Sequence, residues 1–354
     1  MTQKKQPIKG INPAFVPSGK ENSVEKKANS KAPLDILNLA QKIISGNHTA
    51  LSQGITLVES TVAKHQKQAQ ELIERCLPHT QSSLRIGITG VPGVGKSTFI
   101  EALGTLLTKK NKKVAVLAVD PSSSISHGSI LGDKTRMDKL SQDPKAFIRP
   151  SASGDSLGGV ARKTREAIIL CEAAGFDTLI IETVGVGQSE HAVHSMVDFF
   201  LLLKLAGAGD ELQGIKRGII EMADAIVINK ADGENKKAAQ MAKTAFAKAL
   251  HLYPAKESGW VPKVTTCSAI ENEGIEEIWK MMTSYFETAK SQKFFEAKRA
   301  EQNTFWLLQT IEATLKDNFY RDPKVKASLP ALLKAVSEGT LSPFAAAAQL
   351  LENQ

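Results

Sequence analysis

The segment Leu84-Arg-Ile-Gly-Ile-Thr-Gly-Val-Pro-Gly-Val-Gly-Lys-Ser97 decides the fold of this chain. It opens with a short, mostly apolar run, Leu84–Thr89, that is typical of a buried strand. From Gly90 it matches the pattern G-x-x-x-x-G-K-[S/T] in full, and a helical pattern follows directly. A strand, a glycine-rich loop and a helix in this order predict a loop that wraps around phosphate groups.

Each residue type in this loop has a chemical reason to be there. Glycines let backbone N–H groups point inward at phosphate oxygens, and the N-terminus of the following helix adds partial positive charge. Lys96 is expected to reach the β- and γ-phosphates, and the Ser97 hydroxyl to bind magnesium. The predicted nucleotide-binding residues of the loop are Gly90, Val91, Pro92, Gly93, Val94, Gly95, Lys96, Ser97 and Thr98.

Downstream of the loop, short apolar runs alternate with helical patterns. Apolar strands separated by helices predict an α/β fold of the P-loop NTPase kind, with a parallel sheet and helices on both faces. Ligands of such sheets bind at the carboxyl ends of the strands. The predicted strands are Leu84–Thr89, Lys113–Val119, Ala146–Ile148, Thr178–Ile181, Phe199–Leu203, Ala225–Ile228 and Val264–Cys267.

The segments before this nucleotide-binding domain, which spans residues 81–290, have other patterns. Residues 1–33 lack periodicity and are typical of a disordered, Lys-rich tail. Residues 34–80 predict an N-terminal helical segment, in which Gly46 ends one helix and Pro78 ends a second, single longer one.

Residues 291–354 predict a C-terminal helical arm. Pro323 breaks its first helix, and a final helix runs near Pro343–Leu351. The first helix carries an apolar stripe at helical spacing, which indicates either core packing or a dimer interface. The stripe comprises Phe305, Leu308, Ile311, Leu315 and Phe319.

Composition and charge bound the class of protein. The 354 residues are 42% hydrophobic, which is enough to bury a sizeable core. The longest apolar runs are far shorter than the roughly 18 residues of a membrane helix, and the N-terminus has no apolar run of a secretory signal. Residues 1–32 hold seven Lys and two Glu, so +5 of the net +8 belongs to the tail, and binding to nucleic acid is not expected. Three widely spaced cysteines, Cys76, Cys171 and Cys267, favour reduced thiols and a cytoplasmic location.

Two further strand ends predict which base is bound. Asn229-Lys-Ala-Asp232 follows a predicted strand, and the Asp232 carboxylate can accept from guanine N1–H and the 2-amino group. Adenine presents no such pair of donors, so a buried carboxylate rejects it. Lys230 can lie along the base, and Asn229 can tie this loop to the phosphate loop. After the last strand, backbone N–H groups at Ser268-Ala269 can donate to guanine O6. The pattern favours GTP over ATP, and the predicted base-binding residues are Asn229, Lys230, Asp232, Ser268, Ala269 and Ile270.

Acidic residues at two other strand ends predict the metal and γ-phosphate contacts. In Glu182-Thr-Val-Gly185, Glu182 can hold magnesium through water, and the Gly185 N–H can contact the γ-phosphate. Asp120 can position the attacking water or bind magnesium, and Asp133 is a second candidate, although either aspartate can also be a mere helix N-cap. The predicted catalytic residues are Lys96, Asp120 and Glu182.

In these details the sequence resembles the methylmalonyl-CoA mutase-associated GTPase family, also called the MeaB/ArgK type. The resemblance covers about residues 34–354 and rests on five long segments as well as on the phosphate loop. These segments are Val119–Ser123, Gly128–Met137, Leu157–Glu166, Glu182–Glu190 and Gly207–Lys216.

The resemblance implies a SIMIBI-class G-domain with a C-terminal dimerisation arm, and hence a homodimer. It implies slow, magnesium-dependent GTP hydrolysis by a chaperone of an adenosylcobalamin-dependent acyl-CoA mutase, with methylmalonyl-CoA mutase as the expected partner. Such proteins gate cofactor loading and help to replace damaged cofactor. By motif match, the magnesium-site residues are Ser97, Asp120, Asp133 and Glu182. A third switch, which couples nucleotide state to the mutase, corresponds to Gly207, Gly209, Asp210, Glu211, Gln213 and Lys216.

The chain departs from the family pattern at two switch positions. His127 stands where the first switch commonly has Gly, and Ala206 stands where the third commonly has Pro. Other functions also remain open from the residues alone. A nickel metallochaperone GTPase shares this G-domain but should carry a His-rich tract or a Cys/His pair. A phosphotransferase needs an acceptor pocket and a base. An ATPase or kinase linked to basic amino-acid transport is suggested by older family naming, and the guanine motif argues against it.

Overall fold

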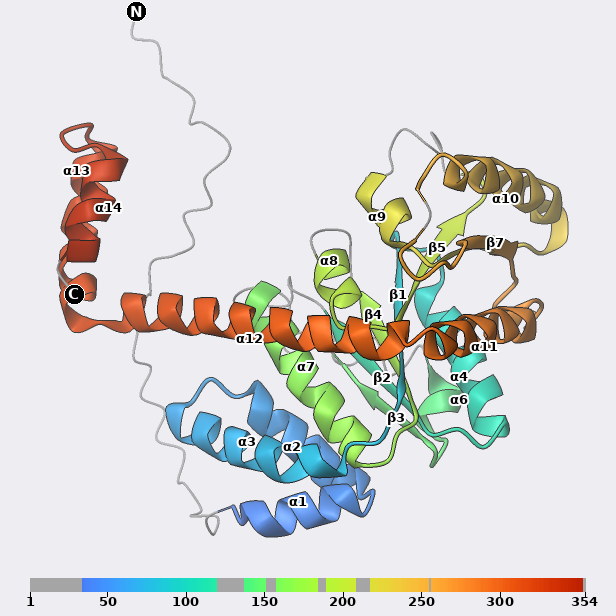
Figure 1. The fold of residues 1–354 in the computed structure, drawn as a ribbon, viewed down its shortest axis with the longest axis horizontal. Coiled ribbons are helices and arrows are strands. Elements are labelled where there is room, and N and C mark those ends of the chain that lie inside the picture. Colours follow the sequence, from blue (N-terminus) through green and yellow to red (C-terminus); the bar gives the residue numbers. More distant parts are fainter. Residues whose placement is uncertain are drawn as a thin grey trace, which may run out of the picture. The chain divides into compact units, whose positions relative to one another are not determined.

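The strand that leads into the phosphate loop, β1 (Leu84–Gly90), lies in the middle of a seven-stranded sheet. The computed structural model describes residues 34–119, 137–150, 157–183, 189–207, 217–254 and 256–352. The strand order is β3-β2-β4-β1-β5-β6-β7 with every neighbouring pair parallel, which confirms the predicted sheet (Figure 1). The other strands are β2 (Val114–Val119), β3 (Ala146–Arg149), β4 (Thr178–Thr183), β5 (Phe199–Leu205), β6 (Ala225–Asn229) and β7 (Lys263–Thr266).

The strands differ from the predicted ranges mainly at their carboxyl ends. β4 continues through Glu182 and Thr183, two polar residues that an apolar pattern excludes. Glu182 pairs with Ile88 of β1 and with Ala118 of β2. The Thr183 hydroxyl donates to the Thr89 hydroxyl of β1, 2.9 Å away, so its polar group is satisfied within the buried sheet. β7 begins and ends one residue earlier than predicted, so Cys267 lies just beyond it.

Helices cover both faces of the sheet, as predicted (Figure 1). Neighbouring residues of one strand show this directly, because Ile180 packs into one core and Ile181 into the other. α4, α6 and α11 pack on the Ile180 face, whereas α7 and α8 pack on the Ile181 face, and α9 and α10 pack against β5 and β6. These helices are α4 (Lys96–Lys109), α6 (Asp138–Ser141), α7 (Leu157–Ala173), α8 (Ser189–His194), α9 (Arg217–Met222), α10 (Lys236–Leu250) and α11 (Ile275–Ser291), with a 3-10 turn at Gly233–Asn235.

The N-terminal helices pack on α7 and belong to the same hydrophobic core. The first of them ends in a Schellman motif, which confirms Gly46 as its C-cap residue: Gly46 has φ +81°, its N–H donates to Ile43 O, and the Asn47 N–H donates to Lys42 O. These helices are α1 (Ile36–Ile44), α2 (His48–Glu59) and α3 (Ala63–Cys76), followed by a 3-10 turn at Leu77–His79.

The prediction of one longer helix ended by Pro78 is wrong, because the chain breaks between α2 and α3. The Ser60 hydroxyl oxygen accepts the Val62 N–H at 3.3 Å and lies 2.8 Å from His65 Nδ1. A serine side chain that binds nearby backbone competes with helical hydrogen bonds. Val62, which helical spacing placed on the apolar face, is consequently 54% exposed.

A buried ionic network fixes the start of α12 (Phe294–Arg321) to the sheet domain. Arg85 of β1 donates to Glu172 of α7 at 2.8 and 3.0 Å, and Arg299 of α12 donates to Asp198 at 2.9 and 2.7 Å. Burial lowers the pKa of Arg299, but Asp198 and then Glu172 outweigh that effect and raise it above the usual value. The four charges therefore join β1, α7, the start of β5 and α12.

α12 also donates to the backbone that follows α8. Gln302 Nε2 donates to Val197 O at 2.9 Å, and Trp306 Nε1 donates to Ser195 O at 3.0 Å. α8 itself packs close to β1, since a Cβ on Gly87 would lie 3.1 Å from the side chain of Val193 in α8. The C-terminal end of α8 is thus held between the sheet and α12.

Removing one charge from this network is expected to destabilise the fold. Glu172→Gln leaves the buried Arg85 guanidinium without its anion, and breaking a buried pair on one side costs about 3 kcal/mol. Urea denaturation measures this change in the free energy of unfolding. Glu71→Gln, in the exposed Arg75–Glu71 pair of α3, is the matched control and is expected to cost under about 1 kcal/mol. Equal losses in the two variants would contradict the structural role of the network.

Beyond Trp306, α12 carries the predicted apolar stripe on its surface. Leu308 and Leu315 are 55% and 64% exposed, so the stripe is not part of the core of the described chain. α12 then turns into α13 (Pro323–Ser337), which the sequence did not predict, and α14 (Pro343–Glu352) packs against α13 (Figure 1). Pro323 ends one helix but also begins the next, because its missing N–H is harmless in a first turn, and the Asp322 side chain caps it by accepting the Lys324 N–H at 2.7 Å.

Candidate functional site

The loop between β1 and α4 has the backbone that a phosphate-binding loop requires. Gly93 and Gly95 have φ of +80° and +91°, in the left-handed region that favours glycine. Gly95 is also packed tightly, since a Cβ there would lie 2.8 Å from Asn229 Nδ2. Lys96 and Ser97 follow as the first two residues of α4, where backbone N–H groups are free of helical partners.

Lys96 lies across this loop. Its ammonium donates to Gly90 O at 2.8 Å and to Val91 O at 3.4 Å, and the residue is 9% exposed. Burial lowers its pKa, and the charges of Glu182 and Glu190 act in the opposite direction. Both carboxylates therefore lie close enough to Lys96 to act on its charge, which brings the end of β4 and the first turn of α8 to the phosphate loop.

Glu190 was not among the predicted site residues. It is 3% exposed, and it closes the segment that begins at Glu182, which is 6% exposed. An acidic residue in the first turn of a helix is usually read as a favourable helix-dipole residue on the surface. The signal that could have identified it is its place at the end of a motif that starts at Glu182, a predicted magnesium-site residue.

The loop after β6 is tied to the phosphate loop through Asn229. Its Nδ2 donates to Val94 O at 2.9 Å, and its Oδ1 accepts the Ala269 N–H at 3.2 Å and the Cys267 thiol at 3.4 Å. The residue is 1% exposed. One buried amide therefore joins three segments at the carboxyl edge of the sheet, which are the phosphate loop, the loop after β6 and the loop after β7.

Asp232 and Lys230 stand next to this amide. The Ser268 hydroxyl donates to Asp232 Oδ2 at 2.6 Å, which orients the carboxylate while leaving its other oxygen available. Lys230 has φ +58°, a left-handed conformation that is uncommon for a residue with a side chain. The Ser268 and Ala269 N–H groups, which the sequence assigned to guanine O6, donate in this structure to Glu273 O and Asn229 Oδ1. Ile270 is 74% exposed at the outer end of this loop.

Several predicted residues lie outside the described part of the chain. They are Asp120, Asp133 and Gly185 of the predicted metal and γ-phosphate contacts, His127 of the first switch, and Gly209, Asp210, Glu211, Gln213 and Lys216 of the third. Gly207, the first residue of the third switch, is described and has φ +72°. The described residues thus bring together Lys96, Ser97, Glu182, Asn229 and Asp232 at one edge of the sheet, from three segments: the phosphate loop with the start of α4, the end of β4, and the end of β6 with the loop after it.

Comparison with known proteins assigns this arrangement. The model of the family "Methylmalonyl Co-A mutase-associated GTPase MeaB" matches residues 51–324. The chain belongs to the MeaB family. It is accordingly a GTPase of the MeaB/ArgK type, and the predicted family resemblance is confirmed.

Individual relatives of this family are similar over most of the chain. A protein of Caulobacter vibrioides is 51% identical over 318 residues, which cover 90% of this chain and 97% of that protein. The "GTPase ArgK" of Escherichia coli is 44% identical, covering 88% of this chain and 94% of its own length. The crystal structure of an "LAO/AO transport system kinase" superposes with a TM-score of 0.72 at 37% identity, covering 91% of this chain and 99% of that chain. The P-loop NTPase fold of this MeaB-family chain is thereby confirmed.

The three cysteines are free and buried. Burial raises the pKa of Cys76 to about 11 and that of Cys267 to about 12, and it also raises the pKa of Cys171. These thiols stay protonated at neutral pH and are inert as nucleophiles.

None of the helices within the described ranges combines the length and hydropathy needed to cross a bilayer.

Proposed function

We propose that this GTPase is a chaperone of a cobalamin-dependent acyl-CoA mutase, with methylmalonyl-CoA mutase as its partner. In this role it gates the loading of adenosylcobalamin and protects or reactivates the mutase. The observation that carries the proposal is the match to a mutase-associated family over residues 51–324. This range contains the phosphate loop, the segment Asn229–Asp232 at the end of β6 (the base loop) and all of α12.

The described residues fit a bound magnesium ion. The Ser97 hydroxyl at the start of α4 and the Glu182 carboxylate at the end of β4 supply oxygen atoms, the ligands that Mg²⁺ prefers. Asp120 and Asp133 complete the proposed set of metal ligands. When bound, the ion neutralises charge on the β- and γ-phosphates. Lys96 adds a second positive charge there, and Asp120 positions the attacking water.

The base loop supports GTP as the substrate. Asp232 is held by the Ser268 hydroxyl with one carboxylate oxygen still available, and Lys230 stands beside it. A carboxylate fixed in this way can accept from the two adjacent donors of guanine, which adenine lacks. This is the reason to prefer a GTPase over the transport-linked kinase or ATPase that the name of the 37%-identical structure suggests.

Two further parts of the proposal concern communication and assembly. Gly207 begins the proposed third switch, Gly207–Lys216, and its φ of +72° gives the loop a hinge position at β5. The exposed stripe on α12 pairs with a second copy to form a homodimer. The free, buried thiols are in keeping with a reducing compartment, so we place the protein in the cytoplasm.

The decisive measurement is GTP hydrolysis with and without a purified cobalamin-dependent mutase from the same source. The rate alone is expected to be slow, because no partner completes the site, and it is expected to rise several-fold when the mutase is added. Lys96→Ala protein mixed with the same mutase is the control, because any activity left there comes from elsewhere. Replacing GTP by ATP tests the base assignment in the same assay.

A slow rate that no acyl-CoA mutase changes would leave the GTPase intact and remove the proposed partner. Equal hydrolysis of ATP and GTP would refute the reading of Asp232 instead. The two results are therefore separable in one experiment.

A further inference from the structure

Arg165 of α7 is a buried arginine at the junction with α12. It is 8% exposed, and its guanidinium lies over the Phe305 ring, 5.7 Å from the ring centre, and over the Trp306 ring, 5.2 Å away. The Arg85 guanidinium also lies over the Trp306 ring, 5.7 Å from the ring centre. Phe305 and Trp306, which stand where the exposed stripe of α12 begins, are therefore packed against the buried Arg165 guanidinium.

This cation lacks the anion that its neighbours have. Arg85 and Arg299 pair with Glu172 and Asp198, but within the described residues the Arg165 guanidinium makes neither an ion pair nor a hydrogen bond, and its Nε is buried without a partner. Burial lowers the pKa of Arg165 to about 10, so the group remains charged at neutral pH. Burying a charge without an anion is costly, and an aromatic face replaces only part of the lost hydration.

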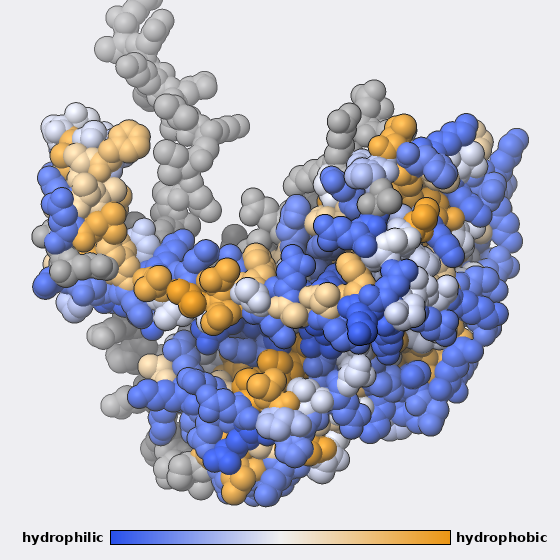
Figure 2. Space-filling view, in the orientation of Figure 1, coloured by the Kyte–Doolittle hydropathy of each residue, from blue (hydrophilic) through white to orange (hydrophobic). Residues whose placement is uncertain are grey.

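The exposed stripe of α12 starts at the same place. Phe305 is 43% exposed, and Leu308, Ile311 and Leu315 follow at 55%, 45% and 64%. Figure 2 shows hydrophobic residues gathered along this part of α12, before α13. At this exposure the four side chains offer roughly 400 Å² of apolar surface, which is close to the largest patch that monomers usually leave in water. Doubled in a symmetric pair, it approaches the roughly 1,000 Å² of a specific interface.

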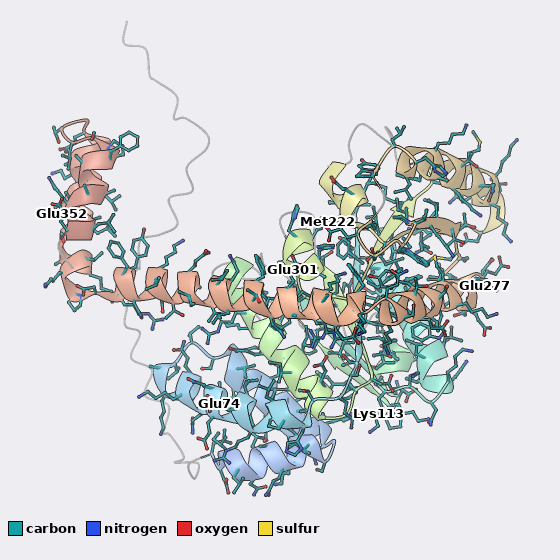
Figure 3. All side chains as sticks on the ribbon, in the orientation of Figure 1. Glu74, Lys113, Met222, Glu277, Glu301 and Glu352 are labelled. Carbon is teal, nitrogen blue, oxygen red and sulfur yellow. The ribbon has the colours of Figure 1, made fainter. Side chains whose placement is uncertain are left out.

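A second copy of α12 fits this surface better than other partners of the same hydrophobicity. The stripe recurs at spacings of three and four along one helix, which is the seam of a helix pair, and a twofold axis brings the same seam face to face. The same seam carries two exposed carboxylates. Glu301 stands four residues before Phe305, and Glu312 lies between Leu308 and Leu315 at helical spacing (Figure 3 marks Glu301).

We propose that Arg165 is a subunit-pairing residue, whose guanidinium is neutralised by a carboxylate from α12 of the second copy when the two stripes pack together. The inference rests on the homodimer proposed above and adds the polar contact that sets its register. Glu312 and Glu301 are the two carboxylates on the packing face. On such a face the apolar side chains can cover the exposed Phe305 ring, and the carboxylate can neutralise the Arg165 guanidinium, whose Nε is buried without a partner.

The test is the dimer dissociation constant by sedimentation equilibrium. Arg165→Met keeps an apolar stem on both rings and removes the charge, and it is expected to weaken the dimer about 30-fold or more. The dependence of dimerisation on salt is expected to become shallower, while the GTP affinity of the separated subunit stays unchanged. Arg162→Met is the matched control: Arg162 lies one turn earlier on α7, is exposed, and forms an ion pair with Glu166 of its own helix.

Charge reversal identifies the carboxylate. Arg165→Glu alone is expected to abolish the dimer, and combination with either Glu312→Arg or Glu301→Arg is expected to restore it. Arg165→Lys retains the charge without the planar fork. Arg165→Lys is expected to give a dimer dissociation constant between those of the wild type and Arg165→Met. It also keeps the test valid if circular dichroism shows that Arg165→Met does not fold.

The outcomes separate this inference from the proposed dimer. If Leu308→Asp dissociates the dimer and Arg165→Met does not, the stripe pairs but Arg165 has no part in it. If the wild-type chain is monomeric at all concentrations, the dimer fails first and the role of Arg165 fails with it. If Arg165→Met weakens binding to the mutase and leaves self-association intact, the second copy is the wrong occupant.

Discussion

Lys96→Ala is expected to lower the affinity for GTP by at least about 100-fold. The ammonium lies in the loop and donates to the Gly90 and Val91 carbonyls, a position from which it can turn to phosphate oxygens. Hydrogen bonds to a charged group contribute about 1.5–3 kcal/mol each, so losing two such bonds lowers affinity by about two orders of magnitude or more. Titration of a fluorescent GTP analogue measures the loss, and a stopped assay measures the matching fall in hydrolysis.

A cation at the other end of the same helix provides the control. Lys109 is the last residue of α4 and is exposed, so Lys109→Ala changes net charge and helix composition equally but leaves the loop intact. Its GTP affinity is expected to stay within a factor of two or so of the wild type, since surface charges contribute little. Wild-type turnover in Lys96→Ala would remove the phosphate loop from the proposed mechanism.

Asp232→Asn is expected to change the preferred base from guanine to xanthine. Guanine presents two donors to the carboxylate, whereas xanthine has an oxygen in place of the 2-amino group, and the asparagine NH₂ can donate to it. Because the Ser268 hydroxyl already donates to one oxygen of this side chain, the amide can keep that bond through its own oxygen. A site built for hydrogen bonds rejects an unmatched base by about 10⁴-fold, so the loss of GTP binding is expected to be large.

Competition between GTP and XTP for one labelled nucleotide checks this exchange. Glu234→Gln removes an exposed carboxylate two residues further on and is expected to leave the preference unchanged. An unaltered GTP-to-XTP ratio in Asp232→Asn would show that another group reads the base.

Local chemistry made much of the fold accessible from the sequence. Apolar runs such as Phe199–Leu203 are buried on both faces, so their pattern survives in any parallel sheet. Gly46 ends its helix through its own positive φ, and the phosphate loop depends on the positive φ of glycines within a few residues of one another, so both could be predicted from local sequence. The helix break at Ser60 was not predicted, because a serine inside an amphipathic pattern is usually tolerated. The hydrogen bond from the Val62 N–H to the Ser60 hydroxyl, which accompanies the break, cannot be read from the pattern.

Contacts between distant residues explain what the sequence did not reveal. Arg85 lies 87 positions from Glu172 and Arg299 lies 101 from Asp198, and a charged residue gives no sign of which distant charge neutralises it. Glu190 was not predicted as a site residue for the same reason. After β7, nothing in the sequence indicates that the Ala269 N–H donates to Asn229, 40 positions earlier.

The short helix α8 has a consequence for how concentration and nucleotide act on this protein. Glu190 in its first turn acts on Lys96, and the residues after its last turn accept hydrogen bonds from Gln302 and Trp306 of α12. Six helical residues thus separate the triphosphate site from the arm. A thermodynamic cycle then imposes reciprocity: if pairing of the arms changes GTP affinity by some factor, GTP changes the pairing constant by the same factor. The apparent GTP affinity would then depend on the concentration of the chain, and the subunit equilibrium would depend on the ratio of GTP to GDP.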